Sequence, residues 1–465
     1  MHGLLSWMEF WQREFLLFSA IWFLIGALDD IVVDLIWGVR WLVRRLTYYR
    51  HQPPMRVAEL PMPQTTAMLA VFIATWQEAG VIGSMLAQCR QLRVSAGAQY
   101  RIYVGCYPND HAGIVEIMKA ASLDANIRLI LSRASGPTTK ADCLNRLWQA
   151  LITDELAEGM KAKAVILHDA EDMVHPDELR VFDRLIERNQ AVQLPVIPVR
   201  VPGSVWISGH YLDEFAEAHG KSLIVREAVG AALPLAGVGC AIDRGILGRI
   251  AVGNNHQPFD SSSLTEDYEL GLRIGALGGR TIFARIADAK GELVGTRACF
   301  PDTLEAAVRQ KARWLTGIAL AGWDRLGWQG GIAETWMRQR DRRAILAALV
   351  LCAAYVSIAL TAALILGRMV GVYQPHSLTS GLKQLLWING GFLGWRLCVR
   401  AGFVGVMYGA YEAMLSIPRT FVANIIGIMA ARRACAAYIG HMFGGHLTWD
   451  KTKHQHFPPV PVSGG

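Results

Sequence analysis

The chain has 465 residues, which is enough for two or three domains or for one large domain with additions. Its hydrophobic fraction of 52% and charged fraction of 18% exclude a typical soluble enzyme and indicate membrane segments beside a globular part. The net charge of +7 suits an anionic membrane leaflet or a phosphate-bearing substrate, and the eight scattered cysteines resemble neither a disulfide framework nor a zinc site.

The first predicted element is a retained transmembrane helix. Residues 15–39 form an apolar span that is too long for the core of a signal peptide. Asp29, Asp30 and Asp34 lie in its second half, where they either face other helices or mark an earlier exit from the lipid. The positive-inside rule places this end in the cytosol, because four arginines lie there: Arg40, Arg44, Arg45 and Arg50.

An α/β region follows a linker with four prolines at residues 51–66. Apolar runs predict strands at residues 68–73, 100–106, 128–131 and 164–167, separated by helical stretches. This alternation indicates βαβ units and a mostly parallel sheet, which binds its ligands beyond the carboxyl ends of the strands. Basic and aromatic residues are not interleaved in this region, so we expect no nucleic-acid partner.

The strand at residues 164–167 runs directly into an acidic cluster. The alternating carboxylates of Asp169 and Glu171 suit a hard divalent cation, which takes oxygen ligands and often bridges to the phosphates of a substrate. Asp172 is a rival for the second position. The cluster could instead be a solvated turn, since a helix is predicted to begin near residues 176–179.

A second acidic cluster covers residues 263–270. Ser263 and Glu266 match a capping box and predict that a helix starts there. Acids in a first helical turn favour the helix macrodipole without any catalytic role. The functional alternative is that one of these carboxylates faces a cleft as a general base.

A third cluster, at residues 310–314, places Gln310, Arg313 and Trp314 on one face of a predicted helix. Arg313 could bind a phosphate, and Trp314 could offer a flat face to a sugar ring. The alternative is an amphipathic helix next to the membrane, where Arg and Trp are common.

The C-terminal part is predicted to return to the membrane. A clean span at residues 344–366 follows an arginine-rich block at residues 338–343. Residues 385–417 are also apolar but contain Arg396 and Arg400. They form either one tilted helix whose arginines face protein, or a short re-entrant piece followed by a second span.

The predicted organisation places a cytosolic domain between membrane anchors. Its parts are a transmembrane helix with a basic segment (1–50), a linker (51–66), the α/β domain (67–337), transmembrane helices (338–417), and an interfacial helix at about 421–438 within a C-terminal segment (418–465).

The order of these motifs resembles the processive, membrane-bound family 2 glycosyltransferases, which include cellulose-synthase-like and hyaluronan-synthase-like enzymes. An Asp-x-acid motif follows a strand, Thr-Glu-Asp comes later at residues 265–267, and Gln-x-x-Arg-Trp precedes membrane helices. The resemblance covers residues 67–459. It implies an α/β GT-A fold of Rossmann-like type, a nucleotide-sugar donor and an inverting transfer of hexose units.

The resemblance also implies a role for each matching residue. Asp267 becomes the catalytic base, and Asp169 with Glu171 holds Mg²⁺ or Mn²⁺. Binding of the donor nucleotide is assigned to Glu78, Asp110, Lys140, Asp142, Asp169 and Lys451. Asp110 stands in Tyr-Pro-Asn-Asp where the family has Asp-Asp-Gly-Ser. The acceptor and pyrophosphate site is assigned to Gly237, Gly239, Cys240, Glu266, Gln310, Arg313 and Trp314.

Two stretches, residues 168–172 and 449–458, are similar to a bacterial inner-membrane branch of this family whose glycan serves as a phage receptor. The second contains Lys451 in a segment that closes over the donor in related enzymes. The resemblance implies a UDP-N-acetylhexosamine donor, with UDP-N-acetylmannosamine as one candidate, and a growing glycan as acceptor. It also implies contact with inner-membrane lipids and an export partner in the outer membrane. Regulation by cyclic di-GMP is expected only with a further domain or subunit.

Two other functions compete with this interpretation. A single-sugar transferase that acts on a polyprenyl phosphate usually lacks Gln-x-x-Arg-Trp, which this chain contains. A non-catalytic membrane receptor or scaffold would not need the full set of acids that the chain retains.

Overall fold

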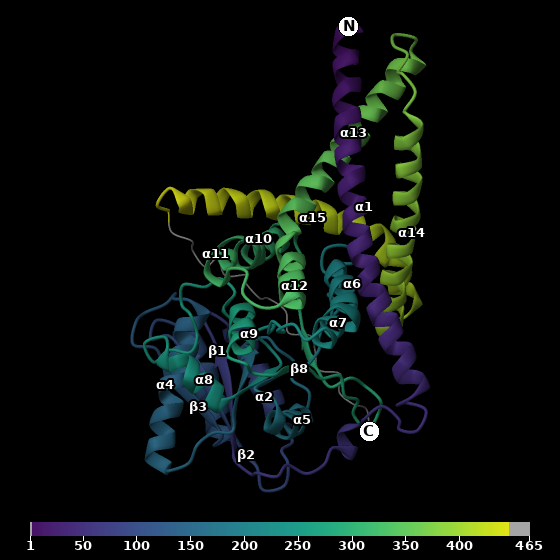
Figure 1. Cartoon of the computed structure of the whole chain (residues 1–465). Coiled ribbons are helices and arrows are strands. Elements are labelled where there is room, and N and C mark those ends of the chain that lie inside the picture. The colour runs from purple at the N-terminus through teal and green to yellow at the C-terminus, as the bar shows by residue number, and fades with distance from the viewer. Residues whose placement is uncertain (1, 446–465) are drawn as a thin grey trace.

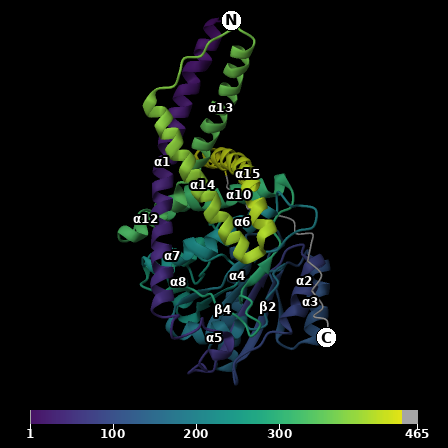
Figure 2. The same cartoon turned by 90° about the vertical axis from the view of Figure 1, so that its right-hand side faces the viewer.

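The structure is a computed structural model that describes residues 2–445. It has two parts, a sheet flanked by helices and a set of long helices above it (Figure 1). Seen from the side, α1 (His2–Leu46) runs from the far end of the long helices to the flank of the sheet part (Figure 2). There it contacts α7 (Leu223–Ala228) and the adjoining π-helical turn η3 (Ala218–Ser222).

The four predicted strands form the parallel core of a seven-stranded sheet: β1 (Met68–Ala74), β2 (Gln99–Cys106), β3 (Ile127–Leu131) and β4 (Ala164–Asp169). The strand order is β3-β2-β1-β4-β7-β5-β8. The added strands are β5 (Ala191–Gln193), β7 (Cys240–Asp243) and β8 (Thr281–Phe283). Only β7 is antiparallel to its neighbours, so the sheet is mixed but mostly parallel, as predicted. A separate parallel pair joins β6 (Val196–Pro198) to β9 (Thr296–Ala298).

Helices cover both faces of the sheet because β1 is apolar on both of its faces. Leu69, Val71 and Ile73 pack into one buried cluster, with α2 (Ala79–Cys89), α3 (His111–Leu123) and α5 (Glu178–Leu185). Ala70 and Phe72 pack into the other, with α4 (Lys140–Glu158), α8 (Arg244–Val252) and α9 (Glu266–Ala276). Successive side chains of a strand point to opposite faces, so a continuous apolar run fills two cores.

The other helices of the sheet part lie mostly between the sheet and the long helices. They are α6 (Gly209–Glu217), α10 (Leu304–Leu315), the π-helical turn η4 (Thr316–Leu320), α11 (Ala321–Leu326) and α12 (Ile332–Arg342). Two short 3₁₀ turns complete this part, η1 (Val57–Glu59) and η2 (Ile186–Arg188).

Four long helices make up the second part: α1, α13 (Ala344–Met369), α14 (Ser380–Tyr408) and α15 (Ala410–Met442). Among the described residues, three helices are long and apolar enough to cross a membrane, namely α1 from Gly3, α13 and α15. The chain is therefore a membrane protein. At 1.5 Å per residue, α1 is about 67 Å long and extends well beyond a hydrocarbon core of about 30 Å.

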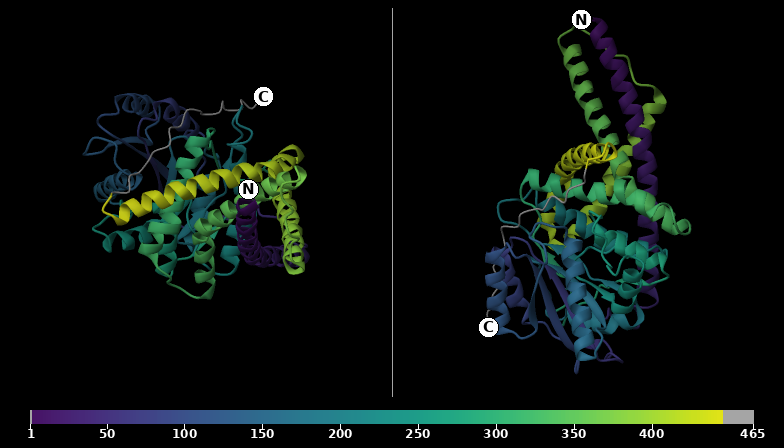
Figure 3. Two further views of the ribbon diagram at one scale, coloured as in Figure 1. Left: turned by 90° about the horizontal axis from the view of Figure 1, so that it is seen from above. Right: turned by 90° about the vertical axis from the view of Figure 1, so that its left-hand side faces the viewer.

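The arrangement of these helices refines the sequence expectations. The predicted spans at residues 15–39 and 344–366 lie inside α1 and α13. Residues 385–417 form neither one helix nor a short re-entrant piece with a second span, because they are divided between the 29-residue helix α14 and the start of α15. Helix α14 is not one of the three helices that are apolar enough to cross a membrane. The helix break lies at Gly409, whose φ of +90° favours glycine. Helix α15 starts beside α14 and then extends away over α10, and the predicted interfacial segment is part of it (Figure 3).

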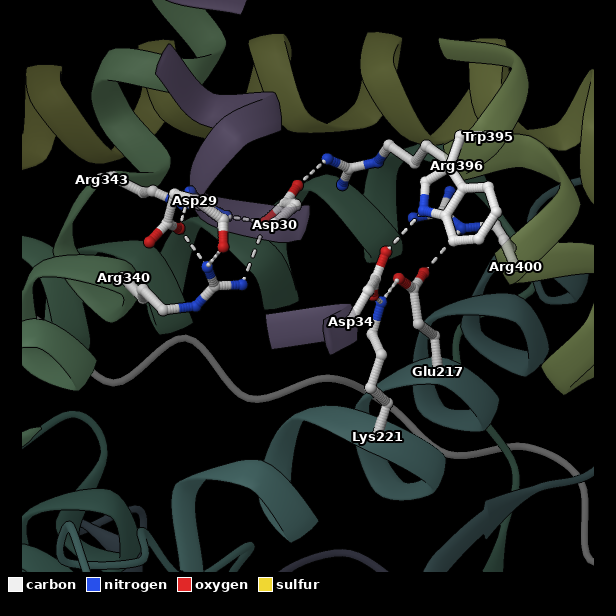
Figure 4. Close-up of polar contacts among 10 residues, drawn as sticks. All are labelled: Asp29, Asp30, Asp34, Glu217, Lys221, Arg340, Arg343, Trp395, Arg396 and Arg400. Carbon is white, nitrogen blue, oxygen red and sulfur yellow. Dashed lines mark hydrogen bonds and ion pairs between the residues drawn. The ribbon is translucent and has the colours of Figure 1, made fainter. Parts of the chain in front are cut away.

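The three aspartates in the second half of the α1 span all pair with side chains of other elements (Figure 4). Asp29 and Asp30 pair with the guanidinium groups of Arg340 and Arg343, where α12 meets α13. Asp30 also pairs with Arg396 of α14. Charges in a membrane segment are tolerated when they pair with one another inside the protein.

Asp34, the third aspartate of α1, joins the membrane helices to the sheet part. Lys221 Nζ lies 2.6 Å from Asp34 and 2.9 Å from Glu217 of α6, as Figure 4 shows. Arg400 of α14 binds the same Glu217 at 3.1 Å. Burial would raise the pKa of Glu217, but Arg400 and Lys221 outweigh it and lower the pKa to about 2. Of the two arginines that the one-helix alternative turned toward protein, Arg400 is largely covered, whereas Arg396 pairs with Asp30 but keeps an exposed side chain.

Replacing Lys221 with methionine should destabilise the junction between the two parts. The Asp34 and Glu217 carboxylates would lose the cation between them, and removal of one partner from a buried ion pair costs about 3–5 kcal/mol. We expect a clearly lower midpoint of thermal unfolding for the detergent-solubilised chain. The matched control is Lys119→Met, which removes an exposed lysine that pairs with Glu116 and should cost at most about 1 kcal/mol. Equal effects of the two substitutions would contradict the junction.

Candidate active site

A cavity of about 360 Å³ lies beyond the carboxyl ends of β1 and β4. The first turns of α4 and α9 and one face of α10 complete its walls. Most of the predicted site residues line this one cavity: Glu78, Lys140, Asp169, Glu171, Glu266, Asp267, Gln310, Arg313 and Trp314. These residues come from five separate stretches of the chain, and a parallel sheet brings them together because its strands end at a common edge.

Lys140 is the central cation of the cavity. Its Nζ lies 2.5 Å from Asp169 Oδ1 and donates a hydrogen bond to the carbonyl oxygen of Gly237 at 3.3 Å. Burial would lower the pKa of Lys140, but the carboxylates of Asp169, Glu266 and Asp267 outweigh it and raise the pKa. The lysine is therefore held charged beside the end of β4, where the pairing of Ala74 with Asp169 aligns β1 and β4.

The Asp172 carboxylate already bonds to neighbouring protein groups, which bears on the choice of the second metal ligand. Its Oδ2 accepts from the backbone N–H of Asp169 at 2.9 Å and lies 3.0 Å from His168 Nδ1. The residue is only 1% exposed. Burial would lower the pKa of His168, but Glu178 and Asp172 outweigh it and raise the pKa to about 10. This arrangement favours Glu171 over Asp172 as the partner of Asp169.

The Glu266–Asp267 pair begins α9 and faces the cavity. The predicted capping box is wrong in detail, because Thr265 is the N-cap residue and Ser263 Oγ instead donates to Glu269 at 2.6 Å. Burial raises the pKa of Asp267, and burial with the charge of Asp267 raises the pKa of Glu266 to about 7. Carboxyl groups with raised pKa values in a cleft are candidates for general acid–base chemistry.

Helix α10 presents its predicted face to the cavity. Gln310 is buried, and its Oε1 has no hydrogen-bond partner among the described residues. Trp314 packs edge-on against Tyr211, with ring centroids 6.3 Å apart. The helix continues into the π-helical turn η4, where Gly317 packs against Thr265 beside the acid pair. Such π-helical turns are frequent at functional sites.

Several predicted residues lie next to the cavity rather than in its lining. Asp110 caps α3 through Gly113 N at 3.1 Å and accepts from Gln77 N at 2.7 Å. Asp142 completes the capping box that begins α4 at Thr139. Both carboxylates thus fix the backbone at the starts of helices α3 and α4. Their direct contact with a nucleotide stays a prediction.

The glycine segment before β7 approaches the cavity through its backbone. A Cβ on Gly237 would lie 2.5 Å from Asp267 Oδ2, and one on Gly239 would lie 2.2 Å from Thr296 Oγ1. Cys240 is buried at the start of β7, and burial raises the pKa of its thiol. Lys451 lies outside the described residues.

The cavity also contains aromatic residues that sequence reasoning missed. Trp76 and Tyr107 pack edge-to-face at 5.2 Å, just beyond the ends of β1 and β2. Their position after predicted strands was a usable signal. Phe215, His219 and Phe300 also line the cavity. No local pattern indicated these three residues, because only tertiary packing brings α6 against the segment before α10.

The residues present fit a metal that shares its ligands with a substrate. Within residues 2–445, no group of three or more His, Cys, Asp or Glu side chains is arranged to hold a metal ion. Asp169 and Glu171 both line the cavity, and Asp169 already faces the cationic Nζ of Lys140. Mg²⁺ is commonly bound by one or two carboxylates together with substrate phosphates, so this donor set is sufficient.

Comparisons with known proteins identify the family to which the chain belongs. The profile described as "Glycosyltransferase like family 2" matches residues 63–317, more than half of the chain. The chain is 34% identical over 462 residues to bacteriophage adsorption protein B of Escherichia coli (strain K12) and to bacteriophage N4 adsorption protein B of Escherichia coli O157:H7. Each alignment covers 95% of this chain and 62% of the relative, so the chain spans about three fifths of the length of these relatives.

Among solved structures, the chain is similar to the mannosyltransferase PcManGT from Pyrobaculum calidifontis in complex with GDP-Man and Mn²⁺. The TM-score is 0.50 at 15% identity, covering 88% of this chain and 98% of that chain. This likeness concerns the fold, which is the GT-A type that the sequence predicted. The sheet order, the ordered acidic motifs in one cavity and the matching profile agree, and the chain belongs to glycosyltransferase family 2.

Proposed function

We propose that the chain is an inverting, processive glycosyltransferase that elongates a surface or exported polysaccharide from a UDP-sugar. One observation carries this proposal. The Lys140–Asp169 pair, the acid pair at the start of α9, and the Gln310, Arg313 and Trp314 face of α10 surround a single cavity. A family 2 transferase needs positive charge for the donor diphosphate and a base for the acceptor hydroxyl, and side chains of both kinds line the cavity.

Asp267 is the proposed general base. It would take the proton from the acceptor hydroxyl as that oxygen attacks the anomeric carbon, on the face opposite the leaving diphosphate. Its raised pKa makes it a stronger base than an ordinary aspartate. Glu266, with its pKa raised to about 7, lies beside it in the acceptor site.

The donor side stabilises the departing diphosphate. Lys140 and Arg313 supply positive charge to the cavity, and preorganised charge is most effective where negative charge develops. Lys451 is expected to add to this charge. Mg²⁺ or Mn²⁺, when held by Asp169 and Glu171, would neutralise the diphosphate as a Lewis acid. The Mn²⁺ in the PcManGT complex supports a divalent metal without fixing which one.

The proposed donor is a UDP-N-acetylhexosamine, specifically UDP-N-acetylmannosamine. The names of the Escherichia coli relatives support a product at the cell surface that a phage can use as a receptor. An export partner in the outer membrane would carry that product outward. The solved mannosyltransferase contains GDP-Man, so GDP-mannose is included among the donors to be tested.

We place the chain in a bacterial inner membrane with the catalytic domain in the cytosol. The arginines near both ends of the sheet part support this orientation by the positive-inside rule. Helix α15 lies against α6 and α10, and its opposite face exposes Met414, Phe421 and Ile425. This geometry supports an interfacial role for α15, with that apolar face in lipid.

Membranes that contain the chain should incorporate sugar from only one nucleotide donor in a radiolabelled panel. The panel contains UDP-N-acetylmannosamine, its two common UDP-N-acetylhexosamine epimers, UDP-glucose and GDP-mannose. We expect incorporation into a polymer from the first compound, and gel analysis gives the product length. A product with one sugar on a lipid would contradict processive elongation, and incorporation only from GDP-mannose would contradict the UDP donor.

Asp267→Asn should abolish sugar transfer and leave donor binding nearly intact. The amide keeps the shape of the side chain but cannot take a proton, and the loss of a general base typically costs about 10²–10⁴-fold in rate. Turnover is measured with labelled donor, and UDP affinity by calorimetry on the solubilised chain. The assignment of the base would be wrong if UDP affinity fell together with turnover.

Gly237→Ala should also reduce transfer strongly, through displacement of the Asp267 carboxylate. The added Cβ would lie 2.5 Å from Asp267 Oδ2, and the φ of +72° strains any residue other than glycine. Gly278→Ala is the matched control, because its φ is +74° and nothing lies within 4 Å of its Cβ. We expect a similar loss of thermal stability in both variants and a loss of turnover in Gly237→Ala alone. Equal turnover in the two variants would contradict the contact with the base.

A further inference from the structure

His168 is buried directly beside the proposed metal site, although it does not line the cavity. It precedes Asp169 at the end of β4 and is 0% exposed. Its Nδ1 lies 3.0 Å from Asp172 Oδ2, and its Nε2 lies 2.8 Å from Glu178 Oε1. Each ring nitrogen thus lies within hydrogen-bond distance of a buried carboxyl oxygen, and the ring is held between two acidic side chains.

The Asp172 carboxylate connects the His168 ring to the turn that carries the proposed metal ligands. The same Oδ2 that meets His168 also accepts from Asp169 N at 2.9 Å. In return, the backbone N–H of Asp172 donates to the carbonyl oxygen of Asp169 at 3.2 Å. Two hydrogen bonds between Asp169 and Asp172, one in each direction, therefore close this turn, and Glu171 lies within it.

Glu178 fixes the other side of the ring to the protein core. It is the first residue of α5 and is 0% exposed. Its Oε2 has no hydrogen-bond partner among residues 2–445, so the imidazole is the partner that satisfies this buried carboxylate. A buried charge that loses its partner is strongly unfavourable, so α5 holds the ring firmly.

We infer that His168 is a positioning residue for the metal–diphosphate site. Clamped between Glu178 and Asp172, it fixes the Asp169–Asp172 turn so that the carboxylates of Asp169 and Glu171 face the cavity. This inference rests on the proposed metal role of Asp169 and Glu171. Groups behind metal ligands typically change metal affinity by about 10–100-fold when they are replaced.

The test compares Mn²⁺ binding by the full chain and its variants in detergent, followed by electron paramagnetic resonance with and without UDP. For His168→Gln we expect a Kd for Mn²⁺ at least about tenfold higher than that of the unmodified chain. Turnover at saturating Mn²⁺ should stay within about threefold, because the catalytic groups themselves remain. A milder variant, Glu178→Gln, keeps an acceptor for Nε2 but removes one charge, so it should raise the Kd less.

His210→Gln is the matched control, because His210 is also about 1% exposed but lies on α6 outside the cavity lining. It should lower thermal stability without changing the Kd for Mn²⁺. Unchanged Mn²⁺ affinity in His168→Gln would overturn the positioning role. If that variant does not fold, unchanged affinity in Glu178→Gln overturns it instead. If the unmodified chain itself binds no Mn²⁺ with or without UDP, the proposed metal role of Asp169 and Glu171 fails, and the positioning role fails with it.

Discussion

The crowding of carboxylates at one edge of the sheet is the constraint on which the rest of the site depends. Asp169, Glu266 and Asp267 are close enough to act on the charge of Lys140, whose pKa they raise. Carboxylates this close repel one another unless cations lie between them. Lys140 supplies that charge on the cavity side, and His168 bonds to Asp172 on the core side. This arrangement leaves Lys140 as a cation that faces the cavity.

A similar compensation holds the membrane helices to the catalytic domain. Asp29, Asp30 and Asp34 are costly in an apolar helix, and each is paired with a cation from another element (Figure 4). Because Lys221 and Glu217 belong to the catalytic domain, the pairing also fixes the domain beneath the helices. The candidate site therefore has a defined position relative to the membrane helices.

Much of the fold and site was predictable from local pattern. Apolar runs located β1 to β4, because a strand buried on both faces needs a continuous apolar run. The order of the acidic motifs and of the Gln310–Trp314 face identified the family, which the matching profile confirms. Local pattern failed for Ser263, which bonds to Glu269 instead of capping α9. It failed again for Phe215 and Phe300, which meet in the cavity only through the packing of separate segments.

The sequence alone determined that a parallel α/β domain with three acidic or polar motifs lies between membrane helices, because periodicity and composition act over a few neighbouring residues. Only the tertiary structure decided which partners the acidic side chains with several possible roles take. Asp172 bonds to His168 and to the backbone of Asp169, and Asp34 pairs with Lys221. The energy of a charge depends on the groups around it in space, and those groups come from segments far apart in the chain.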